Sequence, residues 1–332
     1  MESSSVSPRL PLDDLDRAIV HALEIDGRAP FSRIAAVLGV SEQTVARRYR
    51  RLDADHRARV VGRIDPRRIA AVTWLVRIKT MSDAATAIAE ALARREDTSW
   101  VEITSGGTEV CCLVRNRGPN SGDDLLLRKL PRTPRVAGIQ AQCVLHIAFG
   151  GPGGWMGKMD ALNETQAAAL RDARPPVTAD GPIHLDAADD ALFAHLGRDG
   201  RAGYPDLAAA TGLSESAVRR RVEQLRREGV LFFEMEVAPG LLGHRINVWL
   251  HMSVPPTHLA GVLTELSTHP EVVFAAATTG TTNITASALL RDEGDLYRYL
   301  TTRIAALTAV TSVESTTVIR LVKGEGLIPA DR

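Results

Sequence analysis

The residues best suited to chemistry in this chain are polar side chains that share one face of a short helical segment. They begin at a capping serine and lie away from the apolar positions of the segment: Ser41, Gln43, Thr44, Arg47, Arg48 and Arg51. Arginine and glutamine can hydrogen-bond guanine and adenine edges, and threonine and arginine can hold phosphates. The pattern therefore predicts a helix that reads double-stranded DNA.

The charge around this helix supports the same interpretation. Residues 41–68 carry nine arginines and four acidic residues, whereas a solvated helix face more often mixes both signs. A second segment repeats the pattern with Ser214, Ser216, Arg219, Arg220 and Arg221. Over residues 214–236, however, five arginines are balanced by five glutamates. We therefore expect the first helix to bind DNA more strongly than the second.

Both segments belong to an internal repeat. Residues 12–52 align without a gap onto residues 185–225, at a constant offset of 173. The shared positions include the run Asp26-Gly27-Arg28-Ala29, which recurs as residues 199–202, and Gly39, which recurs as Gly212. A match of this length indicates a duplicated unit.

Apolar residues at helical spacing predict three helices in each copy. We expect Gly27 to end the first helix in a left-handed conformation. Gly39 lies in the turn before the third helix, and Ser41 caps that helix. Two short helices around a glycine-containing turn predict a helix-turn-helix unit. A generic three-helix bundle is the alternative, but it gives no reason for an arginine-rich outer face.

After each third helix the apolar period changes to two, which predicts a wing strand over residues 60–64 and 230–237. Each copy then continues in the order βαββαβ. The predicted fold class is α+β: two winged helix-turn-helix domains alternating with two ferredoxin-like sensing domains. The open face of such a sheet needs a cover, which favours dimerisation or pairing of the chain's own two halves.

The expected domains follow from these boundaries. They are a disordered tail (1–11), the first winged helix-turn-helix (12–66), the first sensing domain (67–149), a linker with a short helix (150–184), the second winged helix-turn-helix (185–239) and the second sensing domain (240–324). The linker opens with Gly150-Gly151-Pro152-Gly153-Gly154. Since no Gly-Lys-Ser/Thr follows, we expect a hinge rather than a phosphate-binding loop.

Composition excludes several classes of protein. The 40 basic and 40 acidic residues cancel, so any DNA-binding field must be local. Three cysteines without CxxC spacing (Cys111, Cys112 and Cys143) fit a reducing, cytoplasmic environment, and the adjacent pair should point to opposite faces of a strand. The nine histidines lack metal-ligand spacing, and no long apolar run predicts a membrane span. No catalytic constellation stands out, so we expect no enzyme.

The motifs resemble a known family. The segments "GVSEQTVARRYRRL" and "GLSESAVRRRVEQLRREGVL", each leading to βαββαβ, resemble the leucine-responsive/AsnC (Lrp/AsnC, feast/famine) bacterial transcription regulators. The stretch "HPEVVFAAATTGTTN" is similar to the family's sensing domain. The resemblance covers nearly the whole chain, twice. It implies a sequence-specific DNA-binding regulator that forms homo-oligomers through its sensing domains, has no cofactor and responds to an amino acid or another small effector.

The resemblance also implies where the effector binds. Matched by position, the site lies at the glycine turns Gly106, Gly107, Thr108 and Glu109, and Gly280, Thr281, Thr282 and Asn283. The family usually has aspartate at the last position, from which Glu109 and Asn283 depart. A tight turn that simply requires glycine is the other interpretation. A second departure is His56, which stands where the second copy has Gly229.

Two other functions remain open. Some sirohaem decarboxylases resemble the same duplicated architecture and would need histidine with tyrosine or arginine converging on a large cavity. Residues 108–112 and 281–285 contain no histidine, so we expect the regulator rather than this enzyme. The third alternative is a scaffold whose helix-turn-helix units have lost DNA binding, which the neutral second copy leaves open for half of the molecule.

Overall fold

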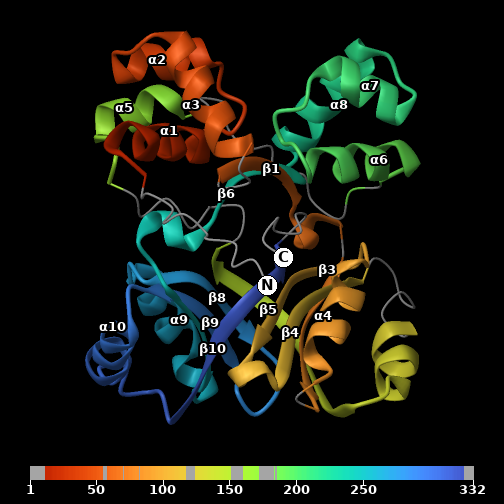
Figure 1. The fold of residues 1–332 in the computed structure, drawn as a ribbon, viewed down its shortest axis with the longest axis vertical. Helices are drawn as coiled ribbons and strands as arrows, with labels where there is room; N and C mark the ends of the chain where they lie inside the picture. The colour runs from red at the N-terminus through yellow and green to blue at the C-terminus, as the bar shows by residue number, and fades with distance from the viewer. Residues whose placement is uncertain are drawn as a thin grey trace, which may run out of the picture.

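The structure is a computed structural model that describes residues 12–54, 58–69, 71–81, 83–116, 124–150, 160–171, 183 and 185–324. The predicted tail, His56 and Gly151 to Gly154 lie outside the described residues. Two groups of helices, called the heads below, occupy one end of the molecule, and a β-barrel flanked by helices occupies the other (Figure 1). No helix within the described ranges is long and apolar enough to cross a membrane.

Each head contains the three helices that the repeat predicts. The first head is α1 (Asp14–Ile25), α2 (Phe31–Leu38) and α3 (Glu42–Ala54), and the second is α6 (Ala187–Leu196), α7 (Tyr204–Thr211) and α8 (Glu215–Arg227). Apolar residues of α3 and α8 recur at helical spacing and are buried: Val45, Tyr49 and Leu52, and Val218, Val222 and Leu225. This spacing leaves the opposite face of each third helix polar.

The glycines of the repeat have two different roles. Gly39 and Gly212 end the second helices with φ of 66° and 71°, a left-handed conformation that glycine adopts at little cost. Gly27 does not have the left-handed conformation that we expected for it, because α1 ends in the extended residue Asp26. A Cβ atom on Gly27 would lie 2.7 Å from Phe233 Cβ. Gly27 therefore permits close packing against the other copy.

The strand after each third helix pairs with its counterpart in the other copy. Strands β1 (Ala58–Ile64) and β6 (Leu231–Val237) form a two-stranded antiparallel ribbon, with register from Ala58 opposite Val237 to Ile64 opposite Leu231. The two expected wing strands thus make one shared ribbon rather than a wing in each head. The two heads are therefore joined by main-chain hydrogen bonds.

Because of the ribbon, each head also packs against residues of the other copy. The core of the first head includes Met235, Val237 and Leu241 of the second copy, and the core of the second head includes Ile64. Short turns then lead into the barrel, η1 (Pro66–Ile69) after β1 and η6 (Pro239–Leu242) after β6. In Figure 1 the first head lies above the helices of the second sensing unit, and the second head lies above α4.

Each sensing unit has the expected βαββαβ order. The first unit is β2 (Val72–Thr80), α4 (Ala85–Ala93), β3 (Thr98–Thr104), β4 (Glu109–Asn116), a π- and 3-10-helical segment (Asp124–Lys129 and Leu130–Arg132) and β5 (Val136–Phe149). The second is β7 (Ile246–Ser253), α9 (Leu259–Thr268), β8 (Val272–Thr278), β9 (Ile284–Leu290), α10 with a π-helical turn (Glu293–Arg298 and Tyr299–Ile304) and β10 (Ser312–Lys323).

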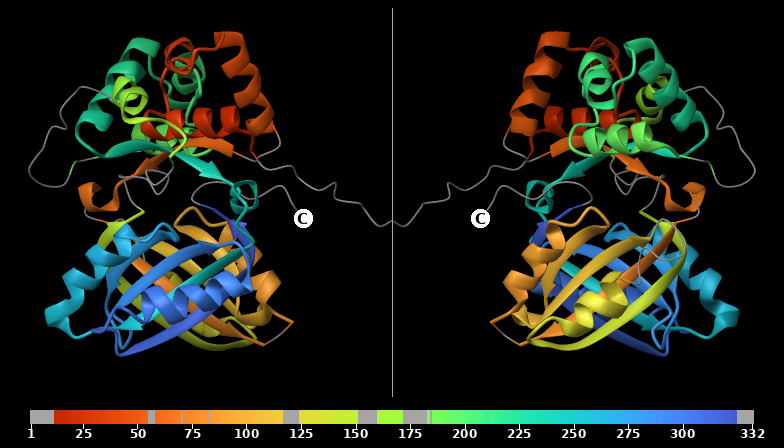
Figure 2. Two further views of the ribbon diagram at one scale, coloured as in Figure 1. Left: turned by 90° about the vertical axis from the view of Figure 1, so that its left-hand side faces the viewer. Right: turned by 90° about the vertical axis from the view of Figure 1, so that its right-hand side faces the viewer.

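The two sheets close into a single barrel (Figure 2). The strand order is β10-β3-β4-β2-β5-β8-β9-β7, and β10 also pairs with β7. The last strand of each unit therefore joins the first strand of its own unit to the second strand of the other unit, as β5 does with β2 and β8. Of the two ways to cover the open sheet face, the structure shows pairing of the chain's own halves.

Alternation along the strands separates two environments. Residues facing the helices form an apolar core in each unit, whereas residues facing the lumen include Leu75, Leu113 and Trp249 together with polar side chains. The adjacent cysteines follow this rule, because Cys112 packs in the helix-side core and Cys111 packs in the lumen. The prediction that the two thiols point to opposite faces is confirmed.

Helix α5 (Glu164–Leu170), from the segment between the halves, packs against the first head. Leu162 and Leu170 join the core of that head, and the Leu162 N–H donates to His21 Nδ1 at 3.2 Å. The Arg33 guanidinium donates to the carbonyl of Ala169 at 2.7 Å. The first head therefore carries a fourth helix.

Candidate nucleic-acid interface

The third helices α3 and α8 begin in the same way. The Ser41 hydroxyl accepts the N–H of Thr44 at 3.1 Å, and the Ser214 hydroxyl accepts the N–H of Ala217 at 3.3 Å. Each cap satisfies a backbone donor that the helix itself leaves unpaired. The two serine hydroxyls therefore cap the third helices, and both serines are exposed at the first turn of the helix.

The outer face of each third helix exposes the residues that the sequence singles out. Gln43 and Arg47 are exposed on α3, and Ser216, Arg219 and Arg220 are exposed on α8. With the repeat offset of 173, Arg47 and Arg220 occupy equivalent positions. Within the described part of the chain, neither of these two arginines forms an ion pair. Both guanidiniums are thus available to a polyanion.

Three of the predicted DNA-contacting arginines are instead bound to carboxylates of their own head. Arg48 pairs with Asp13 and lies 3.1 Å from Asp16 Oδ1, and Arg51 lies 2.6 Å from Asp16 Oδ2. Arg221 makes two bonds to Asp189, at 2.8 and 2.6 Å. These arginines connect the third helix to the first helix of the same head. The sequence pattern did not separate them from their exposed neighbours.

Arg219 has a different environment on α8. Its guanidinium lies 4.2 Å from the ring centroid of Tyr204, the first residue of α7. A cation over an aromatic face is attracted by the ring quadrupole, and at an exposed site the interaction contributes about 0.5–1 kcal/mol. Thr44 on α3 is half-buried, and its hydroxyl lies 2.9 Å from that of Ser41. These contacts orient polar groups around the start of each third helix.

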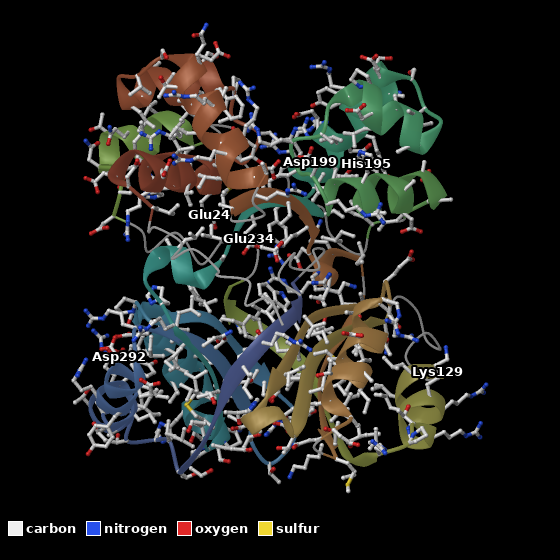
Figure 3. All side chains as sticks on the ribbon, in the orientation of Figure 1. Glu24, Lys129, His195, Asp199, Glu234 and Asp292 are labelled. Atoms are coloured by element: carbon white, nitrogen blue, oxygen red, sulfur yellow. The ribbon has the colours of Figure 1, made fainter. Side chains whose placement is uncertain are left out.

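Charged residues also line the junction between heads and barrel. Arg63 on β1 pairs with Glu234 on β6 at 2.6 Å, and both side chains are buried. Glu24 accepts the N–H of Met235 at 2.8 Å, and Glu24 and Glu234 lie beneath the heads in Figure 3. The Arg63 guanidinium is 5.4 Å from the ring centroid of Trp100 at the start of β3. Trp100, with φ of 49°, therefore links the ribbon to the barrel lumen.

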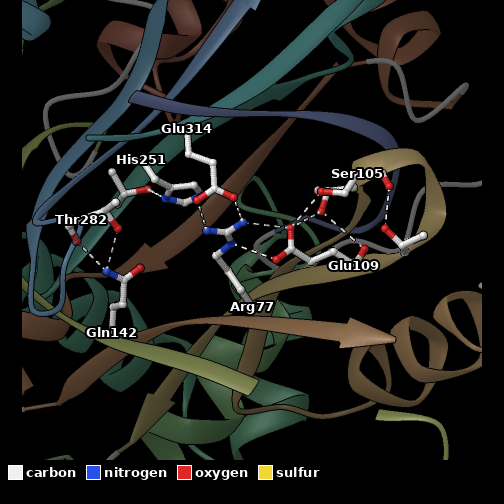
Figure 4. A network of polar contacts seen from close by, with 10 residues as sticks. Arg77, Ser105, Glu109, Gln142, His251, Thr282 and Glu314 are labelled. Carbon is white, nitrogen blue, oxygen red and sulfur yellow. Dashed lines mark hydrogen bonds and ion pairs between the residues drawn. The ribbon is translucent and has the colours of Figure 1, made fainter. Parts of the chain in front are cut away.

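The first predicted effector turn is exposed at its tip and closed at its base. Gly106 and Thr108 are exposed, and an added Cβ on Gly106 or Gly107 would meet nothing within 4 Å. The Glu109 carboxylate, by contrast, is buried and pairs with Arg77 of β2, at 3.0 and 3.2 Å (Figure 4). Its charge is thus already matched by a cation of the protein.

Arg77 also binds the other half of the chain. It donates to Glu314 on β10 at 2.9 and 2.6 Å, so its guanidinium bridges two carboxylates. These hydrogen bonds to Glu314 and Glu109 outweigh the desolvation of Arg77 and raise its pKa. The same pair lowers the pKa of Glu314. Sequence reasoning missed Arg77, although a charged residue inside an apolar strand was a visible signal.

The second predicted effector turn is hydrogen-bonded to a residue of the first half of the chain. Gln142 of β5 donates through Nε2 to the carbonyls of Thr279 and Thr282, at 2.8 and 2.6 Å (Figure 4). A Cβ on Gly280, whose φ is 106°, would lie 2.8 Å from Gln142 Nε2. The Asn283 amide both accepts from and donates to the backbone of Val254. The last residue of each turn, Glu109 or Asn283, is therefore already hydrogen-bonded within the protein.

A histidine lies beside these turns, although the sequence placed none nearby. His251 on β7 is buried, and its Nδ1 atom is 3.2 Å from Thr285 Oγ1. Burial, with a smaller contribution from the charge of Arg77, lowers the pKa of His251 to about 4. The imidazole is thus neutral at pH 7. Within the described residues, no group of histidines, cysteines and carboxylates is arranged to hold a metal ion.

Glu102 of β3 is a buried ionisable group in the lumen. Burial raises its pKa to about 7, although hydrogen bonds from Trp249 Nε1 at 2.5 Å and Asn247 Nδ2 at 3.3 Å favour the charged form. Cys111, which is also fully buried, has a raised pKa. Among the residues that the structure describes, no cation contacts this carboxyl group, whose pKa of about 7 places its change of charge near neutral pH.

Comparisons with known proteins identify the types of domain in the chain. The AsnC-type helix-turn-helix domain matches residues 12–53 and 185–226, and the Lrp/AsnC ligand binding domain matches residues 247–328. An uncharacterized HTH-type transcriptional regulator of Pyrococcus abyssi is 31% identical over 145 residues, which cover 43% of this chain and 91% of that protein. An HTH-type transcriptional regulator of Mycobacterium tuberculosis is 31% identical over 140 residues, which cover 41% of this chain and 92% of that protein.

The duplicated fold as a whole is similar to a solved enzyme. The siroheme decarboxylase NirDL has a TM-score of 0.62 and 14% identity, with 94% of this chain and 93% of that chain covered. That enzyme in complex with an iron-uroporphyrin III analogue gives a TM-score of 0.63. At this identity the likeness shows the shared fold alone. The helix-turn-helix domain matches twice, and regulators that align over nearly their whole length cover less than half of this chain. The chain therefore belongs to the Lrp/AsnC family of transcriptional regulators, in a tandem-duplicated form.

Proposed function

We propose that the chain is a sequence-specific regulator that binds double-stranded DNA with two different heads at once. The observation that carries this proposal is the pairing of β1 with β6, which joins two helix-turn-helix units within one polypeptide. The exposed arginines Arg47 and Arg220 then occupy equivalent places on the two third helices. Because the two heads differ in sequence, the preferred site is asymmetric rather than a palindrome.

The geometry of paired heads sets the expected binding site. Half-sites about one helical turn apart, ~10 bp, suit two reading helices that enter the major groove from one side. Contacts to phosphates release counterions, so the affinity falls steeply with salt concentration. The test is a footprint of the chain on the DNA upstream of its own gene at two salt concentrations, with unrelated DNA as control. Binding that is absent, or insensitive to salt, contradicts the proposal.

The first head is the stronger reader in this proposal. Its surroundings carry an excess of arginine, and α3 exposes both Arg47 and Gln43. Over residues 214–236, which include α8, five arginines are balanced by five glutamates, and Arg219 is already placed over Tyr204. If the heads contribute equally to binding, this ranking is wrong, while the proposal that both heads bind DNA still stands.

We also propose that the exposed tips of the glycine turns bind a small effector, in the first place an amino acid. Gly106, Thr108 and Thr281 remain exposed, whereas Glu109 and Asn283 are engaged inside the protein. An effector at these turns would therefore contact hydroxyls and backbone groups rather than the carboxylate. A thermal-shift screen with single amino acids tests this, because a ligand at ~100 times its Kd stabilises the folded state by about 2.7 kcal/mol. If no amino acid raises the Tm, the amino-acid effector is wrong.

A cytoplasmic location and further association into homo-oligomers complete the proposal. The free thiols of Cys111, Cys112 and Cys143 support a reducing compartment. Association would use the outer surface of the barrel, because the lumen-side faces of both sheets already cover each other. Sedimentation at several protein concentrations measures the mass, and a single chain at all concentrations contradicts this part.

A second candidate function is a tetrapyrrole enzyme, which the fold of NirDL favours. His251 beside Thr285 supplies the histidine that the sequence did not place there. Against this candidate, Arg77 is bound by two carboxylates, and Leu75, Leu113 and Trp249 pack together in the lumen. Visible absorbance after incubation with an iron tetrapyrrole, followed by gel filtration, separates the two functions. A stoichiometric bound chromophore would favour the enzyme.

A further inference from the structure

The most distinctive contact between the heads is made by the run that the two copies share. Arg28 of the first copy donates through Nη1 to the carbonyl of Gly200 at 2.8 Å and through Nη2 to that of Ala202 at 3.0 Å. Arg201 of the second copy donates to the carbonyl of Gly27 at 2.6 Å. Each arginine thus binds the backbone of the loop that carries the other one.

Aromatic rings complete each arginine site. The Arg28 guanidinium lies 5.1 Å from the ring centroid of Tyr204, and that of Arg201 lies 4.3 Å from the ring centroid of Phe31. Tyr204 and Phe31 are equivalent in the repeat, and each is the first residue of a second helix. The exchange is therefore reciprocal and obeys the symmetry of the duplication.

The two sites also reach both third helices. The Arg201 guanidinium is 5.7 Å from the ring of Tyr49 on α3, and Tyr204 lies under Arg219 of α8 as well as near Arg28. The Tyr49 hydroxyl in turn accepts the N–H of Val60 on β1 at 3.2 Å. Arg201 thus contacts α3 directly, and Arg28 is linked to α8 through the ring of Tyr204.

The loops that carry these arginines press on the ribbon. A Cβ on Gly200 would lie 2.8 Å from Val60 Cγ1 and 2.9 Å from the carbonyl carbon of Val61. Asp26 and Asp199 shape the loops by accepting the N–H groups of Arg28 and Arg201. Figure 3 places Asp199 between the two heads. Residues of this four-residue run, including the carbonyl of Ala202, thus build the junction between the heads.

We propose that Arg28 and Arg201 are positioning residues that fix the two heads relative to each other and so set the spacing of the DNA half-sites. This inference rests on the proposed DNA binding. The ribbon restrains the twist between the heads only weakly, because two-stranded ribbons twist more than wider sheets. Two planar guanidiniums, each bound to backbone carbonyls and aromatic faces, resist the remaining rotation. Lysine cannot replace them, since its ammonium lacks the planar fork of donors.

The first test measures the distance between the heads without DNA. Spin labels on Gln43→Cys and Ser216→Cys, which are exposed and equivalent in the repeat, report this distance in a Cys143→Ser background. We expect a narrow distribution for the parent and a broader one for R28M/R201M and for R28K/R201K. R227M is the matched control, because Arg227 is exposed and, within the described ranges, hydrogen-bonds to the backbone of its own helix. A distribution that stays narrow in both double variants overturns the proposal.

The second test uses DNA and separates the two ideas. The footprinted site is compared with the same site lengthened by ~5 bp, about half a helical turn, which moves the half-sites to opposite faces. We expect the parent and R227M to lose at least about tenfold in affinity, and R28K/R201K to lose less than about threefold. Equal losses overturn the proposed control of spacing. If the parent binds no DNA, the proposed function fails, while the distance measurement still decides whether the arginines fix the heads.

The stability of the variants is followed in parallel. Each single variant, R28K or R201K, removes only one half of the exchange and serves if a double variant unfolds. A single variant that is folded, with the parent's circular dichroism, must still broaden the distance distribution. If it does not, the arginines only stabilise the fold, and the proposal is wrong.

Discussion

The carboxylate of Asp189 accepts two hydrogen bonds from the guanidinium of Arg221, and at the equivalent positions of the first head the carboxylate of Asp16 accepts one from Arg48. Asp189 and Asp16 are both nearly fully buried. A buried carboxylate needs a partner, and in each head the partner comes from the third helix, which we propose to bind DNA. Some of the arginines on that helix therefore belong to the scaffold, and others are available for DNA.

Removal of an exposed arginine should weaken DNA binding without affecting stability. We expect R47A to lower the affinity by about 1–3 kcal/mol if Arg47 contacts a base, or to reduce the slope of log K against log salt by about 0.9 if it contacts a phosphate. R220A should have a smaller effect. Fluorescence anisotropy against a salt series measures both quantities. R132A, in the exposed outer segment of the first sensing unit, is the control. An affinity unchanged in R47A would contradict the interface.

Removal of the Asp189 side chain should lower stability, because two separate contacts are lost. The side chain pairs with Arg221 and also accepts the N–H of Asp186 in the capping box of α6. We expect D189A to lower the free energy of unfolding by about 2–3 kcal/mol, because Arg221 keeps some access to water and the cap adds ~1 kcal/mol. Urea unfolding measures the change, and a double-mutant cycle with R221A isolates the pair. A coupling near zero would contradict the ion pair.

The Asp189–Arg221 pair should also be sensitive to acid. Although desolvation raises the pKa of Asp189, the hydrogen bonds from Arg221 and from the Asp186 backbone outweigh it, so the pKa is lowered overall. Its stabilising contribution is therefore present above the ordinary aspartate pKa and is lost as the pH falls through the lowered value. The difference in unfolding free energy between the parent and D189A should shrink in acid. A difference independent of pH would exclude this carboxylate as the cause.

The contribution of Glu102 to stability should depend on pH in the opposite direction. Its pKa in the folded state is about 7 against an ordinary value of 4.5, so folding favours the protonated form. The contribution of Glu102 to stability is then fully present below pH 4.5 and is lost as the pH rises through 7, by about 3 kcal/mol for a shift of this size. We expect E102Q, which keeps an acceptor for Trp249, to lose less stability than the parent between pH 5 and 8. The free energy of unfolding is measured at both pH values, and an equal change in the parent and E102Q would contradict the raised pKa.

Two glycines should respond to alanine for different reasons. G200A places a Cβ against Val60 and the backbone of β1, so overpacking should cost about 1–3 kcal/mol. G39A meets nothing within 4 Å, and its cost of about 1–2 kcal/mol should come from the left-handed φ of 66° alone. G138A is the control, because Gly138 has neither a near neighbour nor a positive φ. Thermal unfolding ranks the three. A neutral G200A would show that the loop can move away from the ribbon.

Periodicity and repetition in the sequence determined much of this protein. The helical stripes of α3 and α8, the glycine turns at Gly39 and Gly212 and the βαββαβ order all follow from local patterns, because side-chain spacing reports which face is buried. The constant offset of 173 showed the duplication without any structure. The resemblance to the Lrp/AsnC family, which the comparisons support, depended on these same local motifs.

Only the tertiary structure decided how the two copies combine. Nothing local distinguishes a wing from a shared ribbon, or Arg48 from Arg47, because partners such as Asp16 and Arg48 are distant in the chain. The same holds for Gln142 beneath the second glycine turn and for His251 beside Thr285. The ribbon and the contact of Gln142 depend on strand pairing between the halves, and backbone hydrogen bonds between strands leave no signature in the sequence of either strand. The sequence therefore specified the parts, and the closure of the barrel and the ribbon specified which side chains meet.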